Sequence, residues 1–272
     1  MKIIFAGTPK FASEHLSILF RGEHEIVAVL TQPDRKSGRG KKISFSEVKE
    51  IALENDLKVL QPASLKDVEI QKSINNLKPD IILVVAYGLL IPKTVLDMPK
   101  LGGINIHASL LPRWRGASPI ESCIAAGDSK SGITMMKMSE GLDEGPILKK
   151  FVCHLDEKET LETLEKKFIG MSFENLLQFL KDYENKKISE VIQPTTGSTY
   201  ANKIDNTFKR INWAGQTAGE IENKIRALNP KYGAFTYLGE ERIKLFSASP
   251  KKNNSSVEPG LILINKEGSL EI

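Results

Sequence analysis

The segment that decides the fold lies at the start of the chain, at residues 2–32: KIIFAGTPKFASEHLSILFRGEHEIVAVLTQ. Residues 2–7 and 25–32 are unbroken, largely β-branched apolar runs, which predict strands buried on both faces. Residues 10–20 predict a helix between them. This strand–helix–strand order is typical of a parallel sheet with helices on its faces.

The same alternation continues along the first two thirds of the chain. Further strands are predicted at 80–88, 103–107, 132–138 and 147–155, and further helices at 45–55, 66–77 and 160–180. We therefore predict an α/β fold, a doubly wound, mainly parallel, Rossmann-like sheet.

The first strand–helix turn argues against a dinucleotide cofactor. A Rossmann nucleotide site uses three glycines, whereas this turn contains only Gly7, and Pro9 removes a backbone donor. We interpret it as a tight turn with Pro9 at the first helical position.

A smaller domain is predicted after a polar segment at 189–204, which we interpret as a linker. Beyond it, residues 218–228 predict an amphipathic helix, and 234–246 and 261–272 predict β-hairpins. The expected domains are 1–188, 189–204 (linker) and 205–272. Because the chain stops within an apparent strand, we expect the last domain to be truncated.

Composition indicates an ordinary globular protein, with 40% hydrophobic and 26% charged residues among 272. Cys123 and Cys153 have neither a disulfide pattern nor metal-ligand spacing. With no signal peptide or membrane span, we expect the cytoplasm. The net charge is +4, and residues 201–252 carry ten Lys/Arg against five acids. Charge alone favours a solvated basic surface, although the excess could attract a polyanion.

Three segments are candidates for chemistry. Asn105 and His107, two apart on a predicted strand, share one face and could stabilise an oxyanion and transfer a proton. Asp143 lies in the turn GLDEGP at 141–146, where an Asp is also a common turn former. Five of the eight residues at 35–42 are basic, which suits either a phosphate-binding loop or a solvated one.

In order and spacing these segments resemble the methionyl-tRNA formyltransferases, a branch of the folate-dependent formyltransferase family. The resemblance is carried by these motifs: FAGTP at 5–9, TQPDR and GRGKK within 31–42, VVAYGLLIP at 84–92, NIHASLLPRWRGASP at 105–119, GLDEG at 141–145, YANKI at 200–204 and IRALNP at 225–230.

This resemblance implies transfer of the formyl group of 10-formyltetrahydrofolate, without a metal, to the α-amino group of initiator methionyl-tRNA for translation initiation. It also implies a β-barrel-like C-terminal domain, and we expect a monomer. The implied catalytic set is Asn105, His107 and Asp143. The implied folate site is Ser109, Leu110, Leu111, Pro112, Ala86, Tyr87, Gly88, Leu89, Leu90 and Ile91. The implied tRNA contacts are Arg35, Arg39, Lys41, Lys42, Lys209 and Arg210.

Other functions stay open at this point. A folate formyltransferase acting on glycinamide ribonucleotide or an amino sugar would share the Asn, His and Asp residues but would not need the basic segments. A formylfolate hydrolase would use water in place of the amine. A non-catalytic RNA-binding protein would be indifferent to loss of His107.

Overall fold

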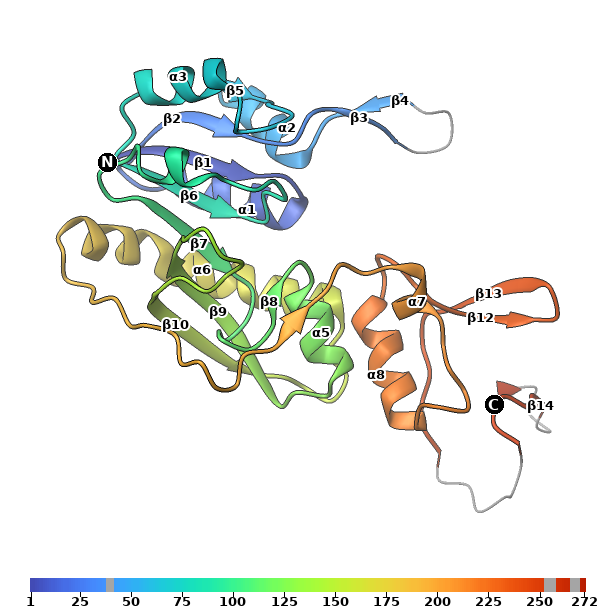
Figure 1. Ribbon diagram of the computed structural model, residues 1–272. Helices are drawn as coiled ribbons and strands as arrows, with labels where there is room; N and C mark the ends of the chain where they lie inside the picture. Colours follow the sequence, from blue (N-terminus) through green and yellow to red (C-terminus); the bar gives the residue numbers. More distant parts are fainter. Residues whose placement is uncertain (38–41, 252–257, 265–269) are drawn as a thin grey trace. The chain divides into compact units, whose positions relative to one another are not determined.

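The computed structural model describes residues 1–37, 42–251, 258–264 and 270–272, with side chains outside 36–43 and 263–270 (Figure 1). The chain forms two compact units. The first contains Met1–Pro119, Lys130–His154 and Glu165–Asn202, and the second contains Ile120–Ser129, Leu155–Leu164 and Lys203–Ile272. Residues 189–202, interpreted above as linker, lie in the first unit, and 120–129 and 155–164 lie in the second.

A seven-stranded sheet forms the centre of the first unit, in the order β10-β9-β7-β6-β1-β2-β5. The parallel strands are β1 (Lys2–Gly7), β2 (Glu25–Leu30), β5 (Val59–Leu60), β6 (Ile81–Val85) and β7 (Gly103–His107). β9 (Lys130–Lys137) and β10 (Ile147–His154) add an antiparallel edge. The predicted doubly wound, mainly parallel sheet is confirmed, and its strand order reverses between β1 and β6.

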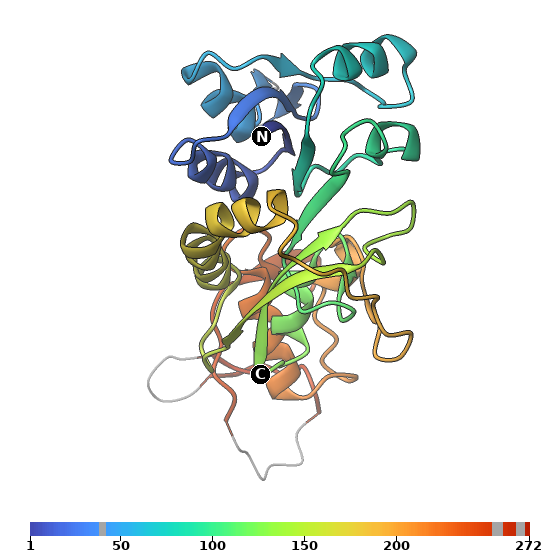
Figure 2. The ribbon, with the colours of Figure 1, turned by 90° about the vertical axis from the view of Figure 1, so that its left-hand side faces the viewer.

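Helices cover both faces of this sheet, which explains why its strands are apolar on both sides. α3 (Val68–Asn76) and α4 (Lys93–Leu96) pack on one face, over Ile4, Leu30 and Ile82. α1 (Lys10–Leu19), α2 (Glu47–Glu54) and α6 (Leu161–Glu184) belong to the other layer, and α1 and α6 lie side by side (Figure 2). Each fully buried aliphatic side chain contributes about 1.5–3 kcal/mol to folding.

The turn after β1 differs by one residue from the prediction. Pro9 is the N-cap of α1 and Lys10 is its first residue. A proline is tolerated at the N-cap as it is at the first helical position. The first N–H groups of a helix have no hydrogen-bond partner within the helix, so the N–H that proline lacks is not needed there.

The second unit combines helices with β-hairpins. α8 (Ala218–Leu228) begins with a capping box between Thr217 and Glu220, and α5 (Pro119–Ala125) and α7 (Asn206–Lys209) are short. β12 (Ala234–Leu238) pairs antiparallel with β13 (Glu241–Leu245), and β14 (Leu263–Ile264) with β15 (Leu270–Glu271), which confirms both hairpins. The core contains Ile211, Ile221, Ile225, Leu228 and Ala234.

Besides β5, four further short strands are not anticipated by periodicity. β3 (Arg35–Ser37) pairs with β4 (Lys42–Ser44), and β8 (Arg115–Gly116) pairs with β11 (Tyr200–Ala201). Among the helices in the described ranges, none is both long and apolar enough to cross a membrane.

Candidate active site

The structure brings Asn105, His107 and Asp143 together at the carboxyl end of β7. Asn105 and His107 are on that strand, and Asp143 is on the loop between β9 and β10. Asn105 Nδ2 donates to Asp143 Oδ1 at 3.1 Å, and His107 Nδ1 lies 3.5 Å from Asp143 Oδ2. One carboxylate therefore contacts both strand residues, at the edge of the sheet where open α/β folds bind ligands.

Backbone groups hold this set on two further sides. The Gly116 N–H donates to Asp143 Oδ2 at 2.8 Å, and His107 Nε2 lies 2.8 Å from the Trp114 carbonyl oxygen. Because a carbonyl oxygen only accepts, Nε2 must carry a proton here. The imidazole is thus oriented between a carboxylate and a carbonyl, an arrangement suited to a proton donor.

The site is sheltered from solvent but still open to a substrate. The His107 side chain is 5% exposed and that of Asp143 is 13% exposed, so water screens their interaction weakly. Asn105 is half-buried, and its second N–H has no acceptor among the described residues. That N–H is available to a developing negative charge.

The segment Ser109–Pro112 follows β7 and presents its side chains unevenly. Ser109 is buried and donates to the Arg113 carbonyl oxygen at 2.6 Å, and Leu111 is buried against Met136 and Ile147. Leu110 and Pro112 are both half-buried. Ser109 and Leu111 can therefore reach a ligand only through their main chain in this conformation.

The segment Ala86–Ile91 follows β6, at the point where the strand order reverses. Ala86 has φ 46° and Gly88 has φ 78°, and both are exposed, whereas Tyr87 and Ile91 belong to the core. Thr8 Oγ1 and Gln32 Nε2 both donate to the Tyr87 carbonyl oxygen, at 2.9 and 3.0 Å. These two bonds fix a turn whose neighbouring backbone faces solvent. Leu89 is half-buried and Leu90 is exposed.

Tyr87 carries an unusual buried group. Its hydroxyl has no hydrogen-bond partner among the described residues, and burial raises its pKa to about 12. The Tyr87 hydroxyl is therefore neutral at physiological pH and does not act as a base.

The predicted tRNA contacts are only partly described. Arg35 and Arg210 are exposed and Lys209 is half-buried, whereas the side chains of Arg39, Lys41 and Lys42 lie outside the described residues. Arg210 lies 5.5 Å from the centre of the Tyr237 ring.

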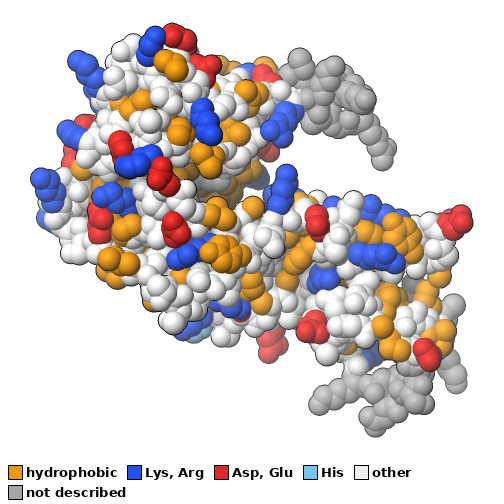
Figure 3. Space-filling view, in the orientation of Figure 1, with side chains coloured by type: hydrophobic (Ala, Val, Ile, Leu, Met, Phe, Trp, Pro, Cys, Tyr) orange, Lys and Arg blue, Asp and Glu red, His pale blue; other side chains and the backbone are white. Residues whose placement is uncertain are grey.

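The β12–β13 hairpin adds basic and aromatic residues that the sequence reading missed. Figure 3 shows Lys and Arg beside hydrophobic side chains over it. Arg242 lies 3.7 Å from the centre of the Phe235 ring, and Tyr237 is 47% exposed. The available signal was a pair of aromatic residues, Phe235 and Tyr237, followed after a turn by Arg242 and Lys244, but it equally suits an ordinary amphipathic hairpin.

Residues 189–202 also contribute to the site, although their polar, Pro- and Gly-containing sequence predicts a linker. Gln193 Nε2 donates to the carbonyl oxygens of Asp143 and Gly145, both at 2.8 Å. Thr199 accepts from Trp114 N and Arg115 N, at 2.9 and 2.8 Å. Short-range periodicity contains no signal for such long-range contacts.

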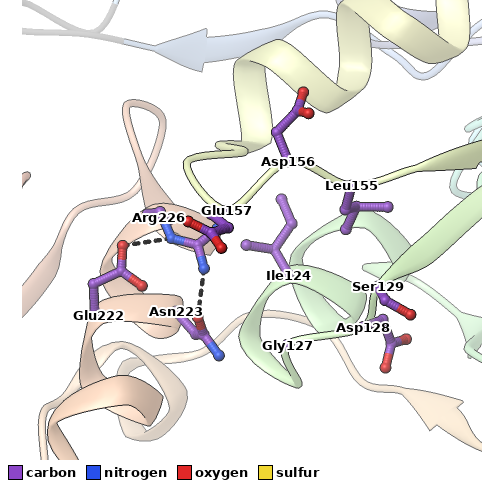
Figure 4. Close-up of a pocket in the computed structure, with 10 residues that line it drawn as sticks. All are labelled: Ile124, Gly127, Asp128, Ser129, Leu155, Asp156, Glu157, Glu222, Asn223 and Arg226. Carbon is purple, nitrogen blue, oxygen red and sulfur yellow. Dashed lines mark hydrogen bonds and ion pairs between the residues drawn. The ribbon is translucent and has the colours of Figure 1, made fainter. Parts of the chain in front are cut away.

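A separate pocket of about 370 Å³ lies within the second unit (Figure 4). Arg226 is fixed at its wall by Glu222, by Asn223 and by the carbonyl oxygen of Glu159. Its other lining includes the acidic residues Asp128, Asp156 and Glu157, and none of the predicted site residues. Within the described part of the chain, no three metal-binding side chains gather.

Comparison with known families agrees with this fold. Residues 1–180 match the formyl transferase family, and residues 203–272 match its C-terminal domain. The protein is therefore a formyl transferase.

Similar proteins indicate which branch of the formyl transferase family the chain belongs to. The methionyl-tRNA formyltransferase of Marinobacter nauticus is 42% identical over 272 residues, covering 100% of this chain and 87% of the relative. That of Legionella pneumophila strain Philadelphia 1 is 44% identical over 271 residues, covering 99% and 86%. The chain belongs to the methionyl-tRNA formyltransferase family.

A solved structure of a sugar N-formyltransferase from a Shewanella species shares the fold. Its TM-score is 0.70 at 17% identity, covering 93% of this chain and 99% of that one. At this identity the likeness concerns the fold alone.

Proposed function

We propose that the protein transfers the formyl group of 10-formyltetrahydrofolate to the α-amino group of initiator methionyl-tRNA. The observation that carries this proposal is the Asp143 carboxylate bonded to Asn105 and adjacent to His107, at the carboxyl edge of the sheet. Relatives 42–44% identical over nearly the whole chain support the tRNA acceptor over an amino sugar or a nucleotide.

The chemistry requires a donor to the formyl oxygen and a path for one proton. The amine nitrogen attacks the formyl carbon, and the carbonyl electrons move to oxygen. The second N–H of Asn105 and a proton of His107 stabilise this oxyanion, and one such donor contributes about 3–4 kcal/mol. His107 exchanges its contact with Trp114 or Asp143 for the substrate oxygen.

Collapse of the intermediate completes the transfer. The carbonyl re-forms, the bond from carbon to folate N10 breaks, and N10 gains the proton that the amine loses. Asp143 relays that proton through water and keeps the His107 ring in place.

The folate binds along Ser109–Pro112 and Ala86–Ile91. The exposed, left-handed backbone at Ala86 and Gly88 supports main-chain contacts to the pterin, since a bulky side chain does not cover it. Leu110 and Leu90 provide apolar contact. The Tyr87 carbonyl is already used by Thr8 and Gln32, so it holds the turn and does not bind the ligand.

The tRNA binds through the basic loop at 35–42 and through the second unit. Exposed Arg210 beside the Tyr237 ring, and exposed Arg242 opposite Tyr237 on the paired strand, support this assignment, because guanidinium groups neutralise phosphates and aromatic rings stack on unpaired bases. Lys209 adds charge next to them. The protein acts as a monomer in the cytoplasm, where initiator tRNA is used.

The deciding experiment is an acceptor competition. Labelled formyl from 10-formyltetrahydrofolate is offered to methionyl-tRNA, glycinamide ribonucleotide, an amino-sugar nucleotide and water. We expect label on methionyl-tRNA, lost in His107→Ala and kept in the exposed control His154→Ala. Label on another acceptor, or RNA binding without any transfer, would contradict the proposal.

A further inference from the structure

A buried arginine, Arg115, is connected through Gln193 to the loop that carries Asp143. Arg115 is 9% exposed, and its Nε and Nη2 donate to Gln193 Oε1 at 3.2 and 2.8 Å. Among the described residues, no carboxylate forms an ion pair with it. Because a buried cation needs compensating contacts, its bonds to the neutral Gln193 amide are its main side-chain compensation.

Gln193 connects Arg115 to the loop that carries Asp143, because it forms hydrogen bonds with both. Its amide oxygen accepts both bonds from Arg115, and its amide nitrogen donates to the carbonyl oxygens of Asp143 and Gly145, each at 2.8 Å. Gln193 is 6% exposed. Both of its N–H groups are used, and the adjacent guanidinium polarises the amide and strengthens both donations.

Asp143 needs such support, because its backbone is strained. Its φ of 51° is left-handed, a conformation that is unfavourable for a residue with a side chain. Such conformations persist only where the surroundings hold them. The Gly116 N–H supports it by donating a hydrogen bond to the Asp143 carboxylate. Gln193 supports it by donating a hydrogen bond to the main-chain carbonyl oxygen of Asp143.

The segment carrying Gln193 is itself attached on both sides. Val191 and Ile147 exchange two backbone hydrogen bonds, at 2.7 and 2.9 Å, and Thr199 and Ala201 bond to Pro112–Ala117. Gln193 is therefore held in place before any substrate arrives.

We propose that Arg115 and Gln193 are positioning residues that hold the Asp143 backbone, and so keep its carboxylate between Asn105 and His107. This proposal rests on the proposed role of Asp143 in formyl transfer. Neither residue touches the reacting atoms, and both act through Asp143.

The decisive variant is Gln193→Glu. The glutamate keeps the shape of the side chain and pairs with Arg115, but it cannot donate to the two carbonyl oxygens. Gln178→Glu, at an exposed position of α6, makes the same chemical change away from the site and is the matched control. Gln193→Met, which also removes both donors, serves if the glutamate variant does not fold.

The first readout needs no activity. The Gly116 amide donates to Asp143 Oδ2, so its ¹H–¹⁵N resonance in the ligand-free protein reports the position of that carboxylate. We expect Gln193→Glu to move this resonance toward its position in Asp143→Ala, and Gln178→Glu to leave it in place. An unmoved resonance in Gln193→Glu and Gln193→Met overturns the proposal.

The second readout separates positioning from general destabilisation. We expect kcat to fall roughly tenfold or more, with KM for both substrates nearly unchanged. In an Asp143→Ala background, the same substitution should change kcat less than about twofold, because the group it positions is gone. Additive losses would contradict the proposal. If the wild-type protein formylates no methionyl-tRNA, the proposed function fails and the Gly116 resonance still decides the positioning.

Discussion

At the scale of single residues, the Asn105 amide has the most direct test. One of its N–H groups holds Asp143, and the other is available for the formyl oxygen. We predict that Asn105→Ala lowers kcat by about 10²–10³-fold, since loss of one oxyanion donor has that effect. Steady-state kinetics with both substrates would measure it, and turnover within a few-fold of wild type would show that Asn105 does not have this role.

Gly88 offers a prediction about the folate site. A Cβ at Gly88 would collide with the Gln32 side-chain amide, which donates to the Tyr87 carbonyl oxygen, and its φ of 78° is left-handed. Gly197 has a φ of 79° and open space around a Cβ, so Gly197→Ala shares the strain without the collision.

We therefore predict that both variants lose about 1 kcal/mol of stability from backbone strain, and that Gly88→Ala loses more. Only Gly88→Ala should raise the KM for 10-formyltetrahydrofolate, because only it displaces the turn. Urea unfolding and folate-dependent kinetics would measure the two effects. An equal KM in both variants would argue against the turn as a folate contact.

At the scale of secondary structure, His15 joins α1 to α6. Its Nδ1 donates to the Phe11 carbonyl oxygen at 2.7 Å, and its Nε2 lies 2.8 Å from Ser172 Oγ. Burial lowers its pKa from 6.5 to about 4, because a charged imidazolium is disfavoured there. The ring is therefore neutral in the folded protein over most of the accessible pH range.

The resulting prediction concerns stability against pH. Below pH 6.5 the unfolded chain binds a proton that folded His15 does not, so the contribution is complete above 6.5 and is lost as pH falls toward 4. The shift corresponds to roughly 3 kcal/mol. Urea unfolding at several pH values between 4 and 6.5 would give the free energy of unfolding as a function of pH. This free energy should fall more steeply with falling pH in wild type than in His15→Gln, and as steeply as in wild type in the exposed control His154→Gln. Parallel curves for wild type and His15→Gln would contradict the assignment.

For the molecule as a whole, the charge of the second unit differs from the charge counted along the C-terminal part of the sequence. Residues 201–252 carry an excess of +5, but 120–129 and 155–164 bring acidic residues into the same unit. The acids Asp128, Asp156 and Glu157 line the pocket, while Arg242 is exposed on β13. The exposed cations Arg242 and Lys244 of β13, and not the unit as a whole, are therefore the part that suits a polyanion.

A salt titration tests this distribution. Each phosphate contact contributes about 0.7–0.9 to the slope of log Kd against log salt concentration. We predict that Arg242→Ala reduces the slope for methionyl-tRNA by about 1, and that Glu157→Gln in the pocket leaves it unchanged. Filter binding between low and moderate salt would measure both. An unaltered slope in Arg242→Ala would remove the hairpin from the tRNA surface.

The strands of the central sheet other than β5, and the placement of Asn105 and His107 on one of them, follow from the sequence alone. Apolar runs such as 2–7 and 80–88 are long enough to report burial on both faces, and a period of two places Asn105 and His107 on one face of their strand. These are local consequences of backbone geometry, so they can be read from neighbouring residues.

The residues that contact Asn105 and His107 are known only from the tertiary structure. Asp143 lies 38 residues from Asn105, and Gln193 lies 78 residues from Arg115. Local propensity described the segment carrying Gln193 as a linker, because Pro and Gly mark irregular backbone whether it is free or bonded. Contacts between distant segments depend on how the loops close around the sheet edge, and that geometry is set by packing and long-range hydrogen bonds.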